Sequence, residues 1–586
     1  MSRWTAARIA AHLPALLHDT PLILVSNREP YSHRWHRPTP HTPRADDGAS
    51  AEPTGGDGGW IRRVPAQVSR FFQRGPALRW SQPAGGLTAA LAPVMHACQG
   101  TWVAWGSGSA DRQTVDGQDR VQVPPDNPQY TLRRVWLSEA QVRGFYDGFA
   151  NRALWPLCHL HLERTVFAPR HWRHYQEVNA QFAAVVAEEC AGRQALVWMQ
   201  DYHFALCPAF LRQRLPALAL MHFWHIPWPP WEIYRVCPWR RELLEGLLGN
   251  DLLGFHLAQY CQNFLVCAER ALGVRVDHNA GVVAYEGRDI WVRPFPMSID
   301  YDWWSQVARG RRVARQVTRL RAQPALAFPI LGVGVDRLDY TKGIVKRLEA
   351  LERFLEKYPA YQGRVGFVQI AVPSRTQIAA YRQVKAQVER VVARINTRFG
   401  VETAPPIHYR YAQCTPAEVA VYYRMADFAM VTSLYDGMNL VAKEFVAAQV
   451  EPRGVLLCSE FAGAAEALDA ALIINPYDTE RVADTLKQAI EMSAAEKAQR
   501  MARLQGHIAE HNIYKWLADI FTTLARLHEA SAVPALAAVE AAGGNLPVVY
   551  DTGGRARPPL CSPGIFVPRT PTTDNPARNP TKSLPT

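Results

Sequence analysis

Four cations of this chain each follow an apolar run that has the length of a buried strand: Arg28, Arg337, Lys342 and Arg375. An arginine at the end of a strand can hold a phosphate through two parallel hydrogen bonds. Arg337 and Lys342 stand close together ahead of a glycine, so they suit a diphosphate leaving group whose developing charge they offset. For Arg28, a surface ion pair with the neighbouring Glu29 is an equally simple interpretation.

Two segments have the pattern of loops that lead into helices, where free backbone amides and the helix dipole bind anions. One contains Gly85 and Gly86, and the other covers residues 436–444. In the second segment, Glu444 can accept hydrogen bonds from ribose hydroxyls. A Gly-Gly pair is also common in plain turns, so the first segment predicts little by itself.

Asp201 and His225 are candidates for contacts with a sugar. Asp201 follows another apolar run, where its carboxylate can orient sugar hydroxyls or cap a helix. His225 lies in the aromatic segment 222–231, which can form a platform for a sugar face or a packed core with a rigid turn. The residues alone leave both alternatives open.

The motifs of several other chemistries are absent from the sequence. It contains no HExxH, no paired Cys/His cluster and no acidic pair near a strand end, so we predict no metal site. Gly332 and Gly334 lack the third glycine of a dinucleotide fingerprint, because position 337 is Arg, and there is no GxSxG elbow. We therefore expect no cofactor.

Short apolar runs separated by helical patterns must position these residues. The runs occur before residue 298 and begin again after Pro324, which predicts an α/β fold of two facing, doubly wound, Rossmann-like domains. We place the domains at residues 21–298 and 299–500. Because ligands bind at the carboxyl ends of strands in such sheets, the candidate residues should meet in the crevice between them.

Four further segments complete the predicted organisation. Residues 1–20 form an N-terminal leader without the features of a cleaved signal. A helical segment at 501–535 can return to the first domain. The polar composition predicts a mobile loop at about 32–59 and a disordered, Pro-rich tail at 541–586, and both should be dispensable for folding.

Charge and composition limit the partners. The formal net charge is +12, but the basic residues are scattered through apolar sequence, which argues against nucleic acid and suits an enzyme with anionic substrates. No run of eighteen apolar residues occurs, so we expect no membrane span. The ten cysteines show no paired spacing, which favours a cytoplasmic location. A homo-oligomer is left open.

The order of these motifs resembles the trehalose-6-phosphate synthases of glycosyltransferase family 20. The resemblance runs from about residue 22 to residue 527. It is carried by SNR at 26–28, AGGL at 84–87, TWVAWGSG at 101–108, YDGFANRALWP at 146–156, DYH at 201–203, HIPWP at 225–229, PWR at 238–240, LLGFH at 252–256, VDRLDYTKG at 335–343, QIAVPSR at 369–375, DGMNLVAKEF at 436–445 and SEFAGAA at 459–465.

The resemblance implies a GT-B fold and a retaining glucosyltransferase that joins a nucleotide-glucose, expected to be UDP-glucose, to glucose 6-phosphate. In the implied mechanism the leaving phosphate takes the acceptor proton. The implied donor contacts are Gly85, Gly86, Arg337, Lys342, Cys414 near the base, Asp436, Leu440, Val441, Ala442, Lys443 and Glu444. The implied acceptor contacts are Arg28, Tyr146, Asp201 and Arg375, while Trp155 and His225 shape the reacting sugar site, so the catalytic set is Asp201, His225, Arg337, Lys342 and Trp155.

The sequence also departs from the family pattern. Tyr435 stands where the family commonly has Arg, residues 228–231 replace the common Phe-Pro-Ser/Thr, and the segment 32–82 is long. Glucosylglycerol-phosphate synthase, which uses glycerol 3-phosphate, is the alternative activity. A non-catalytic sugar-phosphate sensor is the alternative of another class, although it would be expected to have lost some of the four cations. The nucleotide (UDP, ADP or GDP) is left open.

Overall fold

The computed structural model describes residues 3–17, 20–36, 77–82, 86–400 and 404–541, with side chains described at 3–17, 20–35, 78–82, 91–400 and 404–527. The chain forms two units, residues 1–525 and 526–586. Of the second unit, the structure describes a helix up to Ala541, with side chains only at Arg526 and Leu527. Residues 542–586 of the tail predicted at 541–586, and residues 37–59 of the predicted loop, lie outside the described residues.

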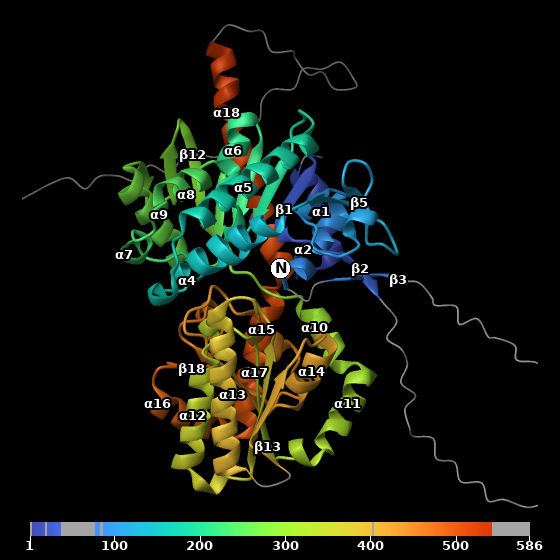
Figure 1. Cartoon of the computed structure of the whole chain (residues 1–586), viewed down its shortest axis with the longest axis vertical. Coiled ribbons are helices and arrows are strands. Elements are labelled where there is room, and N and C mark those ends of the chain that lie inside the picture. Colours follow the sequence, from blue (N-terminus) through green and yellow to red (C-terminus); the bar gives the residue numbers. More distant parts are fainter. Residues whose placement is uncertain (1–2, 18–19, 37–76, 83–85, 401–403, 542–586) are drawn as a thin grey trace, which may run out of the picture. The chain divides into compact units, whose positions relative to one another are not determined.

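Within the first unit, ten described strands form a sheet in the order β10-β11-β12-β9-β8-β7-β1-β4-β6-β5 (Figure 1). Its central pairs are parallel, and antiparallel pairs occur only toward its edges. The central strands are apolar and buried on both faces, as the sequence pattern predicts for a parallel sheet. The strands are β1 (Leu22–Arg28), β4 (Thr101–Trp105), β5 (Arg120–Val123), β6 (Tyr130–Val135), β7 (Leu196–Gln200), β8 (Ala219–Phe223), β9 (Leu252–Phe255), β10 (Arg275–Asp277), β11 (Val282–Tyr285) and β12 (Arg288–Pro294).

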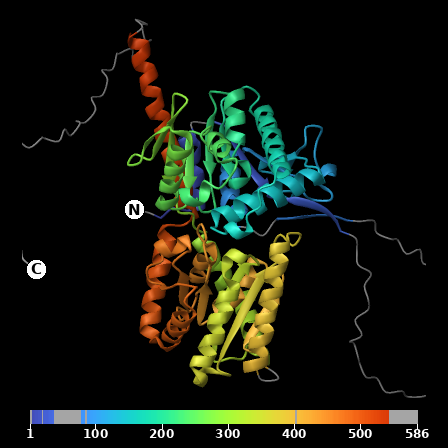
Figure 2. The same cartoon turned by 60° about the vertical axis from the view of Figure 1, so that its left-hand side comes forward.

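Helices alternate with these strands and cover both faces of the sheet (Figure 2). They are α2 (Gly86–Cys98), α3 (Glu139–Gln141), the π-helix η2 (Val142–Leu154), α4 (Trp155–Cys158), α5 (Pro169–Cys190), α6 (Cys207–Arg214), α7 (Trp231–Tyr234), α8 (Arg240–Leu247) and α9 (Ala258–Leu272).

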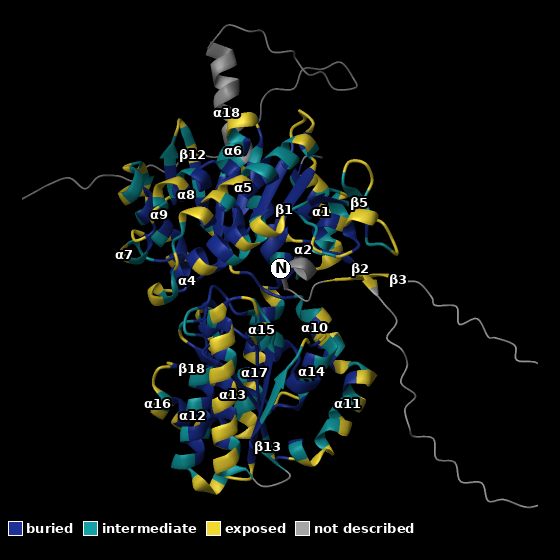
Figure 3. Cartoon of the chain, viewed as in Figure 1, coloured by how far each residue is buried: buried dark blue, intermediate teal, exposed yellow. Residues whose placement is uncertain are grey.

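A second sheet of the same unit is parallel throughout its described strands, in the order β15-β14-β13-β16-β17-β18. Its strands are β13 (Ile330–Arg337), β14 (Val365–Val372), β15 (Ile407–Tyr411), β16 (Phe428–Val431), β17 (Val455–Ser459) and β18 (Leu472–Ile474). Its helices are α10 (Tyr301–Arg309), α11 (Arg311–Arg321), α12 (Ile344–Lys357), α13 (Ala379–Phe399), α14 (Pro416–Met425), α15 (Leu440–Ala447), α16 (Thr479–Glu491) and α17 (Ala494–Glu510). Figure 3 shows both sheets buried between helices whose outer sides are exposed. The predicted pair of doubly wound sheets is confirmed.

The last helix, α18 (Ile513–Ala541), contacts the first sheet through its first turns. The Trp516 ring lies 5.8 Å from that of Trp198 on β7, and its indole nitrogen donates to the carbonyl of Phe295 at 3.1 Å. The boundaries predicted at residues 298 and 500 stay predictions.

Two segments differ from what their composition indicates. The predicted leader contains α1 (Ala6–Leu17), which buries Ile9 and Leu13, and the Asn512 side chain donates to the carbonyl of Trp4. At the start of the predicted loop, β2 (Ser32–His36) pairs with β3 (Ala77–Ser81). The pairing partner of β2 lies more than forty residues away in the sequence, so the local polar composition could not reveal this strand.

Candidate active site

One cavity of about 450 Å³ is lined by residues from both sheets. Its wall is formed by the carboxyl ends of β1, β7, β8, β13 and β14 together with η2 and the segment before α15. This is the position at which open α/β sheets bind ligands. The cavity brings together twelve of the predicted residues: Arg28, Tyr146, Trp155, Asp201, His225, Arg337, Lys342, Arg375, Asp436, Leu440, Val441 and Glu444.

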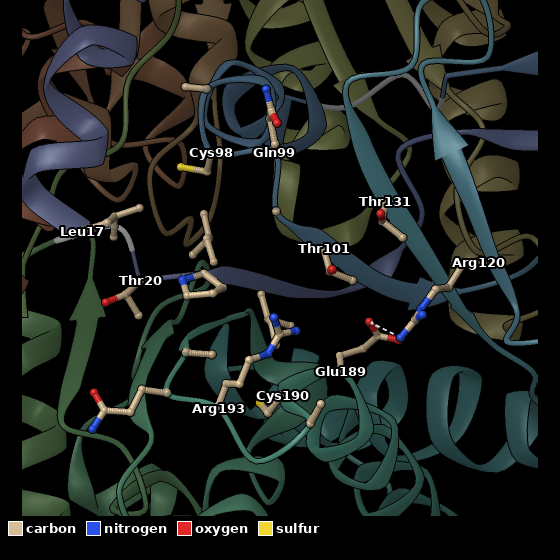
Figure 4. A pocket seen from close by; sticks show the side chains of 18 of the residues that line it. Leu17, Thr20, Cys98, Gln99, Thr101, Arg120, Thr131, Glu189, Cys190 and Arg193 are labelled. Carbon is tan, nitrogen blue, oxygen red and sulfur yellow. Dashed lines mark hydrogen bonds and ion pairs between the residues drawn. The ribbon is translucent and has the colours of Figure 1, made fainter.

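A larger cavity of about 830 Å³ lies at the opposite, amino-terminal ends of β1, β4 and β7 (Figure 4). Its polar lining includes an ion pair between Arg120 and Glu189, whose nitrogen and oxygen lie 3.0 Å apart. None of the predicted site residues that the structure describes lies there. We place the chemistry in the smaller cavity, because the carboxyl ends of the strands and the four predicted cations meet there.

Arg28 is the last residue of β1 and donates to the hydroxyl of Tyr146 at 3.0 Å. Glu29 is not its partner. The Glu29 carboxylate is buried, where it pairs with Arg134 and accepts hydrogen bonds from Ser107. The alternative of a surface pair between Arg28 and Glu29 is therefore wrong, and the exposed guanidinium of Arg28 faces the cavity.

Tyr146 lies on η2, a helix type that is often found at functional sites. Burial raises the pKa of its hydroxyl, but Arg28 and Arg375 lower it more, and the pKa falls to about 8. Arg28 and Arg375 both act on the Tyr146 hydroxyl, so an anion bound beside it would meet two cations.

Arg375 joins the two sheets. It follows β14, and its guanidinium donates to the hydroxyl of Tyr202 at 3.0 Å and to the carboxylate of Asp339 at 3.3 Å. It also lies 4.0 Å from the centre of the Trp155 ring. Since Tyr202 and Trp155 follow elements of the first sheet, Arg375 fixes one edge of the cavity.

Lys342 and Asp436 form an ion pair with 2.5 Å between ammonium nitrogen and carboxylate oxygen, and both side chains are 11% exposed. Burial raises the pKa of Asp436, but Lys342 lowers it more, to about 2. Arg337 ends β13 and lies 5.3 Å from the Trp155 ring. Arg337 and Lys342 thus line the cavity from the second sheet, as Arg375 does.

The first turn of α15 offers backbone amides to the cavity. Asn439 caps the helix, and its side-chain oxygen accepts from the amide of Ala442 at 3.2 Å. Leu440 and Val441 line the cavity, and no hydrogen-bond acceptor in the described structure takes their amides. These amides can bind an anion or a sugar hydroxyl.

Of the other five predicted donor residues, Gly85 lies outside the described residues, and only the backbone of Gly86, where α2 begins, is described. The remaining three do not line the cavity. Ala442 is buried in α15, and Cys414 follows β15 with its thiol near the carbonyl of Ala412. The buried Lys443 ammonium donates to the carbonyl of Met297 at 2.7 Å.

Asp201 and His225 lie together at the ends of β7 and β8. The Asp201 carboxylate accepts from the amide of His225 at 3.2 Å, and the His225 ring contacts the Gln200 side chain at 2.8 Å. Burial raises the pKa of Asp201 to about 6 and lowers the pKa of His225 well below its usual range. His225 is therefore neutral at physiological pH.

Sequence reasoning missed three histidines that line the cavity: His159, His203 and His256. Burial lowers the pKa of each, to about 4 for His159 and about 3 for His256. His159 could have been found, because it stands one helical turn after Trp155, and its ring lies 4.1 Å from the Trp155 ring.

The backbone is strained around the cavity. Asp201, Arg375 and Asn439 have φ angles of 70°, 45° and 76°. Residues other than glycine rarely adopt this left-handed backbone region. Such residues concentrate at binding and catalytic sites, where the surrounding fold holds them.

Within the described ranges, no three His, Cys, Asp or Glu side chains gather as metal ligands would, and no helix is long and apolar enough to cross a membrane.

Two doubly wound sheets that share a cation-lined cavity at their strand ends define a glycosyltransferase of the GT-B class. The model of glycosyltransferase family 20 matches residues 59–526. The chain belongs to this family, and the resemblance seen in the sequence is confirmed.

Similar proteins cover most of the chain. The trehalose-6-phosphate synthase of Mycobacterium avium is 39% identical over 470 residues, which are 79% of this chain and 94% of the relative. A solved trehalose-6-phosphate synthase from E. coli, bound with UDP-2-fluoro glucose, has a TM-score of 0.71 at 30% identity and covers 86% of this chain and 99% of its own. The α,α-trehalose-phosphate synthase of Burkholderia xenovorans in complex with glucose-6-phosphate has a TM-score of 0.71 at 29% identity, with the same coverage.

Proposed function

We propose that the enzyme transfers glucose from UDP-glucose to glucose 6-phosphate with retention, giving α,α-trehalose 6-phosphate. The observation that carries the proposal is the meeting of four cations, Arg28, Arg337, Lys342 and Arg375, in one cavity. Both substrates are anions, and the cavity offers each of them two cations.

The donor binds on the side of the second sheet. Arg337, Lys342 and the amides of Leu440 and Val441 hold its diphosphate and offset the charge that develops as the nucleotide leaves. Glu444 lines the same end of the cavity and can accept from ribose hydroxyls. A relative of this chain is solved with UDP-2-fluoro glucose, which supports a uridine diphosphate donor.

Glucose 6-phosphate binds on the other side. Arg28 and Arg375 hold its phosphate beside Tyr146, whose hydroxyl accepts from Arg28 and has its pKa lowered by both arginines. Asp201 accepts from sugar hydroxyls, while Trp155 and His225 shape the place where the two sugars meet. The acceptor hydroxyl attacks from the side of the leaving group, whose phosphate takes the proton, so the reaction needs no enzymic nucleophile.

Glycerol 3-phosphate fits this site less well. It would satisfy the two arginines but leave Asp201 and part of the aromatic wall without a partner. A site built to hydrogen-bond a substrate rejects an analogue that lacks those groups by about 10⁴-fold. A sensor without activity is disfavoured because all four cations reach the cavity. A cytoplasmic location and the lack of a nucleic-acid partner stay predictions.

The test is a crossed assay of UDP-, ADP- and GDP-glucose against glucose 6-phosphate and glycerol 3-phosphate, with product identification by NMR. We expect trehalose 6-phosphate with α,α-linkage, from UDP-glucose and glucose 6-phosphate. Preference for glycerol 3-phosphate would overturn the acceptor assignment and leave the donor assignment standing. No transfer with any pair, from folded protein that binds UDP, would favour the sensor.

A further inference from the structure

The segment 436–444, called the donor loop below, belongs to the second sheet but is held by residues that follow the first. Tyr260 on α9 donates its hydroxyl to the carbonyl of Asp436 at 3.3 Å, and the Tyr260 side chain is buried. The Tyr260 ring also meets the ring of Tyr435 edge to face, with 6.4 Å between centroids. These contacts fix the start of the loop.

Gly437, the next residue, leaves no room for a side chain. A Cβ at this position would lie 2.6 Å from the carbonyl oxygen of His225 and 3.3 Å from the ring of His256. On the other side, the Gly463 amide donates to the carbonyl of Asp436 at 3.1 Å. The loop is therefore clamped between the end of β8 and its own domain.

The end of the loop is tied down by Lys443. Its ammonium is 3% exposed, donates to the carbonyl of Met297 at 2.7 Å, and has no carboxylate partner in the described part of the chain. Met297 lies where the chain leaves the first sheet, and its amide donates to the ring of His256 at 3.4 Å. Burial lowers the pKa of Lys443 to about 7, and the hydrogen bond to Met297 offsets part of the cost of burying this polar group.

We infer that Tyr260 and Lys443 are positioning residues that hold the donor loop against the first domain, so that Asp436 and the amides of Leu440 and Val441 face the acceptor side. Neither touches the reacting atoms. The inference relies on the proposed function only for the identity of the donor, because the contacts that hold the loop do not depend on which donor binds.

The experiment compares Tyr260→Phe and Lys443→Met with the wild-type chain. Tyr234→Phe is the matched control, because the buried Tyr234 hydroxyl also donates to a backbone carbonyl, that of Arg240 at 2.9 Å, and does not line the cavity. Two quantities are measured: amide hydrogen exchange of peptides covering 436–446 in the ligand-free protein, and the steady-state constants for UDP-glucose and glucose 6-phosphate.

We expect exchange in 436–446 to rise at least about threefold in both variants, and kcat/KM for the donor to fall about fivefold in Tyr260→Phe, as for one lost hydrogen bond. The KM of glucose 6-phosphate should stay within about twofold of wild type. Tyr234→Phe should change neither quantity. If Lys443→Met does not fold, Tyr260→Phe alone carries the test.

Wild-type exchange in 436–446 together with a wild-type donor KM would overturn the inference, as would equal changes in Tyr234→Phe. A chain with no transferase activity would refute the proposed function only. The exchange result would still decide whether Tyr260 and Lys443 hold the loop.

Discussion

Lys342 has two expected tasks: it pairs with the buried Asp436, and it offsets charge on the leaving group. Replacing Lys342 by methionine removes the charge of the side chain and keeps its volume, so the two tasks can be measured separately. Asp436 would then be buried with no cation beside it. In the wild-type protein, the lowered pKa of Asp436, about 2, corresponds to about 2 kcal/mol of stability. Breaking a buried pair by removing one partner costs about 3–5 kcal/mol, since the remaining charge stays desolvated. We expect a loss of that size at pH 7, measured by urea unfolding.

The pH dependence of this loss has a definite sign. The wild-type contribution of Asp436 is present above its ordinary pKa and disappears as the pH falls toward about 2. In Lys342→Met, Ser433 and Asn439 still donate to the carboxylate, but the largest effect that lowers its pKa is gone. The carboxyl therefore takes up its proton at a higher pH than in the wild type, and protonation relieves the variant as the pH falls. The difference in unfolding free energy between the two proteins should therefore shrink between pH 7 and pH 4.5.

Turnover distinguishes the catalytic task from the structural one. Loss of a charge-stabilising group typically lowers turnover by about 10²-fold or more. The double variant Lys342→Met/Asp436→Asn has no buried unpaired charge, so it should recover most of the stability while turnover stays low. Near-normal turnover in Lys342→Met, or recovery of turnover in the double variant, would refute the assignment of Lys342 to the leaving group.

Three further outcomes are expected. Arg28→Ala should raise the KM of glucose 6-phosphate by about tenfold or more while the donor KM stays unchanged, because the lost contact is to the acceptor phosphate; a rise in both constants would contradict it. Asp201→Asn should stabilise the protein by about 1–3 kcal/mol above pH 6 and lower its turnover, since burial raises the pKa of Asp201 to about 6; the gain, measured by urea unfolding, should vanish near pH 4. Thorough chelation with EDTA should leave turnover intact, and restoration of lost activity by magnesium would show that a metal takes part.

The sequence predicts the parts of the site that depend on local pattern. A parallel strand is a short apolar run, and the residue after it must lie at the carboxyl edge of the sheet, so Arg28, Asp201, Arg337 and Arg375 could be placed before the structure was known. The same reasoning placed Lys342, five residues after Arg337, close to this edge of the sheet. What joins these residues is the doubly wound topology, which follows from the alternation of strands and helices.

Other features depend on residues far apart in the sequence. The burial of Glu29 with Arg134 requires β1 and β6 to share a sheet, and from the sequence alone Arg28 was the nearer partner. The strand β2 is visible only through its pairing with β3. Lys443 stands in a segment that resembles a donor site, yet its side chain turns away to Met297, and only the packing of α15 decides that direction.

Four histidines line the cavity without adding positive charge to it near neutral pH. His159, His203, His225 and His256 line it, and burial lowers the pKa of each, so they offer hydrogen bonds without adding charge near neutral pH. The positive charge of the cavity comes from Arg28, Arg337, Lys342 and Arg375. These side chains can pair with the phosphates of two anionic substrates, and neutral imidazoles can offer hydrogen bonds to the sugars without repelling the cations.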